Sequence, residues 1–173
     1  MLPHCLYAFA PYVVKNNPGE NPLYQEDTMS GDSDLINLYS GTILALAADI
    51  PNLGKLETPD AEVKKRSPLC GSTVTVTVTF LDGKISDFRQ DVKACALGQS
   101  AASVIGSTVI GCNQMDITRL NSELTAMLKE NGPAPSAPFE GLEALRPARD
   151  FKNRHASILL VANALAEAFD SQK

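Results

Sequence analysis

The strongest constraint on the fold of this chain is a run in which threonine alternates with an apolar residue, from Thr73 to Phe80. Strict alternation is the period of a β-strand, and it puts the apolar side chains on one face and the threonines on the wetter face. An Asp82-Gly83 pair follows, which favours a tight turn. The sequence therefore predicts an antiparallel hairpin whose return strand covers residues 85–92.

Segments with helical character surround this hairpin. Apolar spacing predicts helices at residues 34–48 (capped by Asp32 or Ser33), 95–110, 115–130, 139–145 and 154–169. Residues 52–66 read as a connecting loop. An antiparallel sheet buries one face under helices, so we expect an α+β fold with helices packed on one face. The sheet should be small, consisting of the hairpin plus about one further strand.

The length of 173 residues fits one domain, which we place at residues 34–173. Residues 1–33 contain clustered turn formers and little periodic apolar content, which predicts a flexible N-terminal extension.

Charge and cysteine usage narrow the functional classes. The formal net charge of −5, from 15 basic and 20 acidic residues, argues against a nucleic-acid partner. No apolar run approaches the ~18 residues of a membrane span. Four cysteines without a Cys-x-x-Cys pair, and an N-terminus lacking signal-peptide features, favour a cytoplasmic protein with reduced thiols.

Two cysteines flank the predicted hairpin. Cys70 precedes the first strand in a Pro- and Gly-bounded loop, and Cys95 follows the second strand at the start of a helix. Those positions are the same end of an antiparallel hairpin, so the two thiols should be neighbours. The N-terminus of a helix also favours negative charge, which suits a reactive thiolate at Cys95.

A histidine completes a candidate site. His155 opens the last predicted helix, with Arg146, Arg149 and Lys152 upstream as a cationic cluster expected near the thiols. Soft thiolates with an imidazole favour zinc, ferrous iron or an iron–sulfur unit over hard cations.

Five segments of the sequence resemble the NifU/IscU-like iron–sulfur cluster assembly scaffolds. The matching segments are Pro51-Asn52-Leu53-Gly54 after a helix containing Tyr39, Ser67-Pro68-Leu69-Cys70-Gly71-Ser72, Asp82-Gly83-Lys84-Ile85, Ala94-Cys95-Ala96-Leu97-Gly98-Gln99-Ser100-Ala101-Ala102-Ser103, and His155-Ala156-Ser157-Ile158-Leu159. They occur in the family's order between Asp34 and Phe169. The resemblance implies a fold of the SufE/NifU type.

The same resemblance implies a role and a set of ligands. The chain is expected to be a scaffold rather than an enzyme, binding iron or a transient iron–sulfur cluster through Cys70, Cys95 and His155. Its implied partners are a cysteine desulfurase and recipient apo-proteins.

Two positions depart from the family pattern. The acidic ligand is replaced by Ser72 and the third cysteine by Ala156. Ser72 is a poor donor for a soft metal, and Asp91, near the same hairpin end, is a second weak candidate for the missing ligand.

These losses leave three alternatives open. The chain could be a degenerate zinc-binding, sulfur-accepting or adaptor protein with the same fold. It could be a thiol enzyme that uses Cys70 and Cys95 as a redox pair. Alternatively, a homodimer could share one cluster between two chains, so that the second chain replaces the missing donors.

Overall fold

The computed structural model describes residues 40–172. The predicted extension at residues 1–33, including the expected caps Asp32 and Ser33, lies outside that range. In chain order the described elements are α2 (Gly41–Ala48), β1 (Ala61–Arg66), β2 (Thr73–Leu81), β3 (Lys84–Lys93), α3 (Ala96–Thr108), α4 (Gln114–Lys129), the 3₁₀ helix η1 (Glu140–Asp150), α5 (Lys152–Ile158) and α6 (Leu160–Asp170).

The predicted hairpin is confirmed as β2 and β3, which pair antiparallel. Asp82 and Gly83 both have positive φ, 51° and 73°, as a two-residue hairpin turn requires. A third antiparallel strand, β1, lies on the other side of β2, so the sheet order is β1-β2-β3. The expected α+β class is therefore confirmed.

The interpretation of residues 52–66 as a loop is wrong for its last part, because Ala61–Arg66 forms β1. Only Ala61 and Val63 of this strand are buried among apolar residues, and the rest of it is charged. An edge strand needs few apolar residues, and lysine is common on such edges. The alternation of buried and exposed residues in β1 is therefore too short and too polar to indicate a strand.

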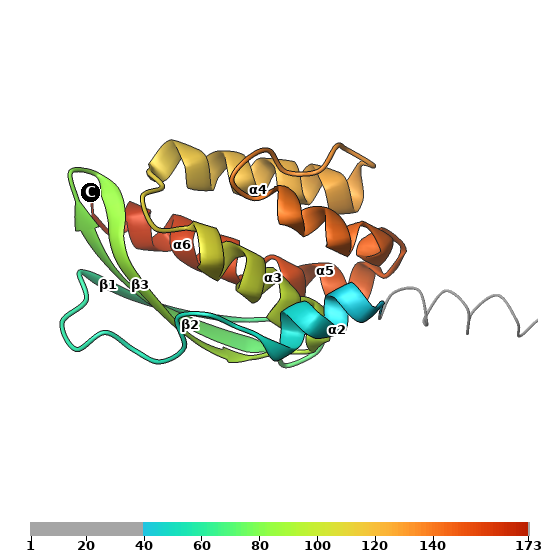
Figure 1. The fold of residues 1–173 in the computed structure, drawn as a ribbon, viewed down its shortest axis with the longest axis horizontal. Coiled ribbons are helices and arrows are strands. Elements are labelled where there is room, and N and C mark those ends of the chain that lie inside the picture. Colours follow the sequence, from blue (N-terminus) through green and yellow to red (C-terminus); the bar gives the residue numbers. More distant parts are fainter. Residues whose placement is uncertain (1–39, 173) are drawn as a thin grey trace, which may run out of the picture.

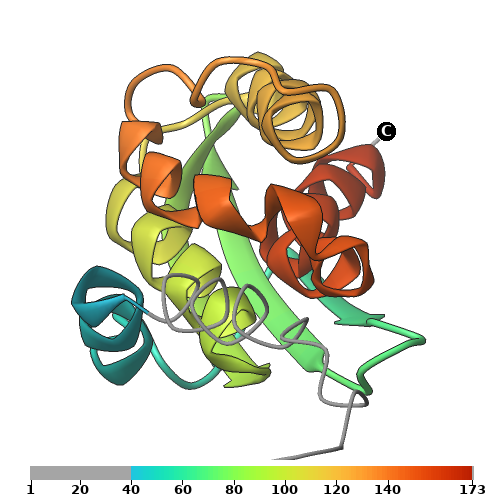
Figure 2. The same ribbon diagram turned by 90° about the vertical axis from the view of Figure 1, so that its right-hand side faces the viewer.

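The helices cover one face of the sheet (Figures 1 and 2). Helix α6 packs on β1 and β2, and α3 packs on β3, while α2 lies against α3. Helix α4 contacts α6 and η1 on the side away from the strands (Figure 1). None of the helices between residues 40 and 172 combines the length and apolar character needed to cross a membrane.

The two faces of β2 differ less in burial than the alternation of threonine and valine suggests. Val74, Val76 and Val78 are fully buried under the helices, as predicted. Thr77 on the opposite face is buried too, because the chain preceding β1 crosses it and the Leu56 amide donates to its hydroxyl at 3.0 Å. The threonine side is therefore partly covered by backbone rather than open to water.

The same segment lies along the outer edge of β3. Gln90 anchors it: its amide donates to the Asn52 carbonyl and its carbonyl accepts from the Gly54 amide. The Gln90 side chain is buried and its Nε2 donates to the carbonyls of Pro51 and Ala102. One residue thus joins this edge of the sheet to α3.

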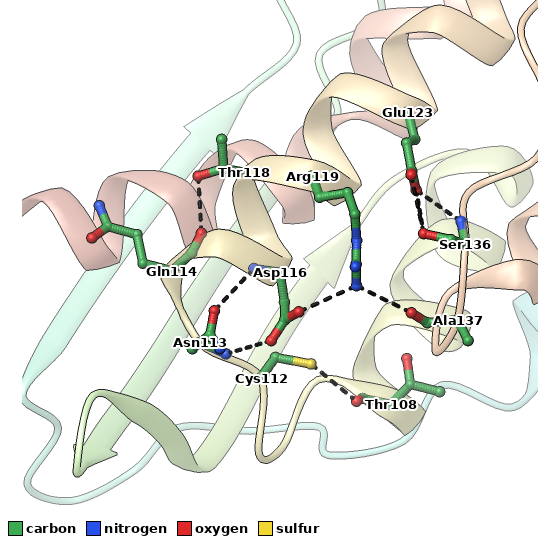
Figure 3. A network of polar contacts seen from close by, with 10 residues as sticks. All are labelled: Thr108, Cys112, Asn113, Gln114, Asp116, Thr118, Arg119, Glu123, Ser136 and Ala137. Atoms are coloured by element: carbon green, nitrogen blue, oxygen red, sulfur yellow. Dashed lines mark hydrogen bonds and ion pairs between the residues drawn. The ribbon is translucent and has the colours of Figure 1, made fainter.

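Helix α4 begins with a capping box and is tied to the following connector (Figure 3). The Asn113 side chain accepts from the Asp116 amide, and the Asp116 carboxylate accepts from the Asn113 amide. Arg119 then bridges the Asp116 carboxylate and the Ala137 carbonyl, each at 3.2 Å. These contacts explain why this helix begins within a residue of its predicted start.

The single helix predicted at residues 154–169 is wrong in one respect. The chain forms α5 and α6 with a break at Leu159. Apolar residues run continuously through the break, so their periodicity carried no sign of it. The predicted helical piece at residues 139–145 extends as η1 to Asp150.

Candidate thiol site

The loop that carries Cys70 is a tight turn between β1 and β2. The Ser67 amide donates to the Ser72 carbonyl at 2.8 Å, and the Gly71 amide donates to the Ser67 carbonyl at 3.1 Å. Gly71 has φ of 71°, a conformation that glycine adopts without strain. These bonds fix the backbone on both sides of Cys70.

Two serine hydroxyls contact the Cys70 thiol. Its Sγ lies 3.2 Å from Ser67 Oγ and 3.1 Å from Ser72 Oγ. Both serines are buried, whereas Cys70 itself is partly exposed. The sulfur is thus accessible to a reagent while its hydrogen-bond partners are shielded from water.

Cys95 is the N-cap residue of α3 and its side chain caps no helix amide. Its Sγ lies 3.4 Å from Ser157 Oγ, and the Ser157 hydroxyl donates to Ser72 Oγ at 3.1 Å. Ser72 and Ser157 therefore connect the two thiols by a chain of hydrogen bonds. Residues 73 and 93 pair directly across the hairpin, which brings the flanking cysteines to the same end of the sheet, as predicted from the hairpin.

Ser157 belongs to the site although the sequence did not predict it as a site residue. It is 1% exposed and comes from α5, far along the chain from both cysteines. Its position two residues after His155 in the last matching segment was the only signal that could have pointed to it.

The hydroxyls change the acidity of Cys70. Burial raises the pKa of the thiol, but hydrogen bonds with Ser67, with the Ser72 side chain and backbone, and with Ser157 lower it more, to about 7. A group with this pKa is largely a thiolate slightly above neutral pH, which is the nucleophilic and metal-binding form. By contrast, burial raises the pKa of the Cys112 thiol, which lies between the end of α3 and the start of α4 and contacts the Thr108 carbonyl (Figure 3). The Cys112 carbonyl accepts from the Ile85 amide beside the hairpin turn, at the other end of the sheet from the two site thiols.

His155 is buried, and its Nε2 lies 3.0 Å from the carbonyl oxygens of both Ala148 and Arg149. Carbonyls only accept, so Nε2 carries the ring proton and donates to the end of η1. Within residues 40–172, no three His, Cys, Asp or Glu side chains are grouped closely enough to hold a metal ion. The structure brings Cys70 and Cys95 together without His155.

Of the two weaker ligand candidates, only Ser72 lies at the thiol site. Ser72 is at the centre of the thiol network. Asp91 pairs with Thr75 across the sheet and therefore lies on the face opposite the helices, where its carboxylate is 3.8 Å from the Lys93 ammonium.

Two of the three cations expected near the thiols, Arg146 and Arg149, bond to other groups. Arg146 binds both carboxylate oxygens of Glu143 and donates to the Gly132 carbonyl. Arg149 bonds to Asn131 and Asp150. With Lys152, Arg149 lines a cleft of about 930 Å³ between the end of α4 and α5, whose wall also includes His155 and Ala156.

Chemically, the site offers two thiols with buried hydroxyls as hydrogen-bond partners. It contains no carboxylate and no third thiol among the described residues. Four donors are usual for a tightly held zinc ion. The arrangement suits reversible binding of a soft metal or of sulfane sulfur better than permanent coordination within one chain.

No family model matches the chain. The iron–sulfur cluster assembly scaffold protein IscU of Streptococcus pyogenes serotype M1 is 27% identical over 137 residues, which are 79% of this chain and 85% of that protein.

Solved structures give a nearer match. The N-terminal part of a nitrogen-fixing NifU-like protein from Brucella abortus is 42% identical, with a TM-score of 0.77, over 79% of this chain and 95% of that one. A proposed scaffold protein for the SUF system from Fervidobacterium islandicum AW-1 is 21% identical, with a TM-score of 0.66, over 76% of this chain and 96% of that one, and supports the fold alone.

Proposed function

Since this chain belongs to the NifU/IscU-like family of iron–sulfur cluster assembly scaffolds, we propose that it carries iron or an iron–sulfur intermediate on Cys70 and Cys95. The observation that carries the proposal is the chain of hydrogen bonds through Ser72 and Ser157, which holds both thiols at one end of the sheet. Thiolates are the preferred protein ligands of iron–sulfur units.

His155 remains a proposed third ligand. Coordination through Nε2 would require the bonds to the Ala148 and Arg149 carbonyls to break, so only Nδ1 is free to bind without rearrangement. We therefore expect His155 to contribute less to metal retention than either cysteine.

The decisive experiment is reconstitution of anaerobically purified protein with ferrous iron and inorganic sulfide. Iron and acid-labile sulfide should bind together, with absorption in the visible range, and both should be lost in Cys70→Ala and in Cys95→Ala. Cys112→Ala is the matched control, because that thiol is buried away from the site, and it should bind as the unaltered protein does. Failure of the unaltered protein to bind iron and sulfide would overturn the proposal.

The missing donors favour a second candidate, a sulfur acceptor. A cysteine desulfurase presents a persulfide, and the Cys70 thiolate would attack its outer sulfur. The partner's S–S bond breaks, its cysteine leaves as a thiolate, and the outer sulfur with its proton stays on Cys70 as a new persulfide. This function predicts a mass gain of one sulfur atom on Cys70 without bound iron.

Zinc bound at the two cysteines in place of iron would indicate a degenerate zinc-binding protein with the same fold.

A cluster shared between two chains is the remaining arrangement. Two copies would supply four thiols, two from each site. The oligomeric mass should then double on reconstitution, and a cluster-loaded monomer would contradict this arrangement.

A reversible disulfide between Cys70 and Cys95, with turnover of a thiol substrate in metal-free protein, would instead identify a redox enzyme.

A further inference from the structure

Exposed basic side chains lie on the sheet face opposite the helices, at the end that carries the thiols. Across the strands Arg66 pairs with Thr73, which pairs with Lys93, and Lys64 lies opposite Thr75 in the next row. Side chains in register point to the same face of a sheet. Lys64, Arg66 and Lys93, called here the basic face, therefore lie on the side of the sheet opposite the helices, and Arg66, at the end of the edge strand, also borders the cleft between β1 and α6.

The charges of the basic face are poorly neutralised. Lys64 and Arg66 are exposed and make no ion pair with any residue between 40 and 172. Lys93 is 76% exposed and has only a 3.8 Å contact with Asp91. By contrast, Lys65 points to the opposite side and pairs with Glu167 of α6. A positive cluster in a chain of net charge −5 is a local feature that an acidic surface would complement.

An apolar side chain lies next to this face. Leu69, in the turn between Pro68 and Cys70, is 72% exposed. The turn follows Arg66 directly, and the Ser67–Ser72 hydrogen bonds hold its backbone in place. Protein interfaces commonly combine an apolar anchor with a polar rim, and a fixed loop loses little entropy on binding.

We propose that Leu69 and the basic face together form a docking surface for an acidic protein that delivers sulfur to Cys70. This inference rests on the proposed function, because it names the kind of partner that the thiol site would meet. A nucleic acid fits less well, since the cluster consists of three side chains in two adjacent rows of an acidic chain and is not an extended basic stripe.

The probe is a purified cysteine desulfurase, titrated against the full chain by calorimetry at low and at physiological ionic strength. The combined variant Lys64→Glu, Arg66→Glu and Lys93→Glu should weaken binding by about tenfold or more, and salt should weaken binding of the unaltered chain. Leu69→Ala should weaken binding with little change in the salt dependence. Lys84→Glu is the matched control, since Lys84 is exposed at the far end of the same hairpin, and it should change affinity less than about twofold.

Several outcomes would overturn the docking surface: no binding of the unaltered chain, equal binding of the charge-reversed chain, or binding of duplex DNA that the same reversal abolishes. If the combined variant does not fold, as judged by circular dichroism, the three single reversals replace it. Reconstitution with free iron and inorganic sulfide needs no partner, and the charge-reversed chain should bind both normally. Failure of that reconstitution in the unaltered chain would count against the scaffold function, whereas unaffected partner binding would count against the docking surface alone.

Discussion

Gly98 of α3 and Ser157 of α5 lie so close together that a Cβ atom on Gly98 would be 2.5 Å from the Ser157 hydroxyl oxygen. The missing side chain leaves the space in which Ser157 reaches both Cys95 and Ser72. The geometry of the thiol site therefore depends on a glycine that contributes no functional group.

Gly98→Ala should disturb this site. In an unstrained helix the change stabilises by about 0.5–1 kcal/mol. Here we expect destabilisation instead, together with a rise in the pKa of Cys70, because the displaced Ser157 loses its hydrogen bonds. Urea denaturation and thiol alkylation measure the two effects. Gly41→Ala in α2, where nothing lies within 4 Å of a new Cβ, is the control and should not destabilise. Equal stability and reactivity of the two variants would show that the Ser157 position is unimportant.

Alkylation of Cys70 should depend on pH around neutrality. Only the thiolate reacts, so the rate should rise with pH and reach half its maximum near pH 7, where the pKa of Cys70 lies. Ser67→Ala removes a hydrogen bond that lowers this pKa, and it should move the midpoint upward toward the ordinary thiol value of 9.0. Iodoacetamide labelling resolved by peptide mass spectrometry measures both. Cys112 is the internal control, since burial raises its pKa and it should stay unlabelled through this range.

His155→Ala should reduce stability more than it reduces metal retention. The substitution removes the hydrogen bonds that Nε2 donates to the Arg149 carbonyl and to the Ala148 carbonyl, which keeps the Phe151 amide as a donor, at a cost of about 0.5–1.5 kcal/mol for each bond. Urea denaturation of metal-free protein measures this cost. His155→Gln offers a donor to the same carbonyls and should recover part of the loss. Unchanged stability with complete loss of bound metal would instead identify His155 as a ligand.

Ala156→Cys should strengthen metal binding. Ala156 is partly exposed and borders a second cleft that also includes Pro68 of the Cys70 turn, so a thiol there can reach the site from α5. A third soft donor worth about 1.4 kcal/mol would raise zinc affinity tenfold, measured by competition with a chelating dye. Ala166→Cys adds a thiol at the far end of the same cleft, and it should leave the affinity unchanged. A similar gain in both variants would contradict a specific site.

The sequence predicts the part of the fold whose cause is local. Thr73–Phe80 alternates strictly and has a turn pair after it, so the hairpin and the approach of Cys70 to Cys95 follow from pairing rules alone. β1 could not be recognised, because its strand character comes from pairing with β2 and not from its own residues. The break at Leu159 lies within a continuous run of apolar residues, so the apolar periodicity of the sequence does not indicate it.

The sequence predicts where the candidate site residues lie along the chain, but not the direction in which each side chain points. His155 is at the expected place in the chain, but its ring bonds to η1, and side-chain direction depends on tertiary packing. The outward direction of Asp91 was deducible, since it alternates with Val92, which packs against the core. Ser157 enters the site only through the approach of α5 to α3, which the sequence does not contain.

The position of β2 in the middle of the sheet also affects the solubility of the protein. A threonine–valine run without charge or proline has the composition of segments that assemble into amyloid. Here β1 covers one of its edges with a lysine-rich strand, and β3 covers the other, with the Gln90-anchored segment shielding the outer edge of β3. Variants that open the sheet would therefore expose an aggregation-prone core, and their loss of stability should appear as precipitation before it appears as soluble unfolded chain.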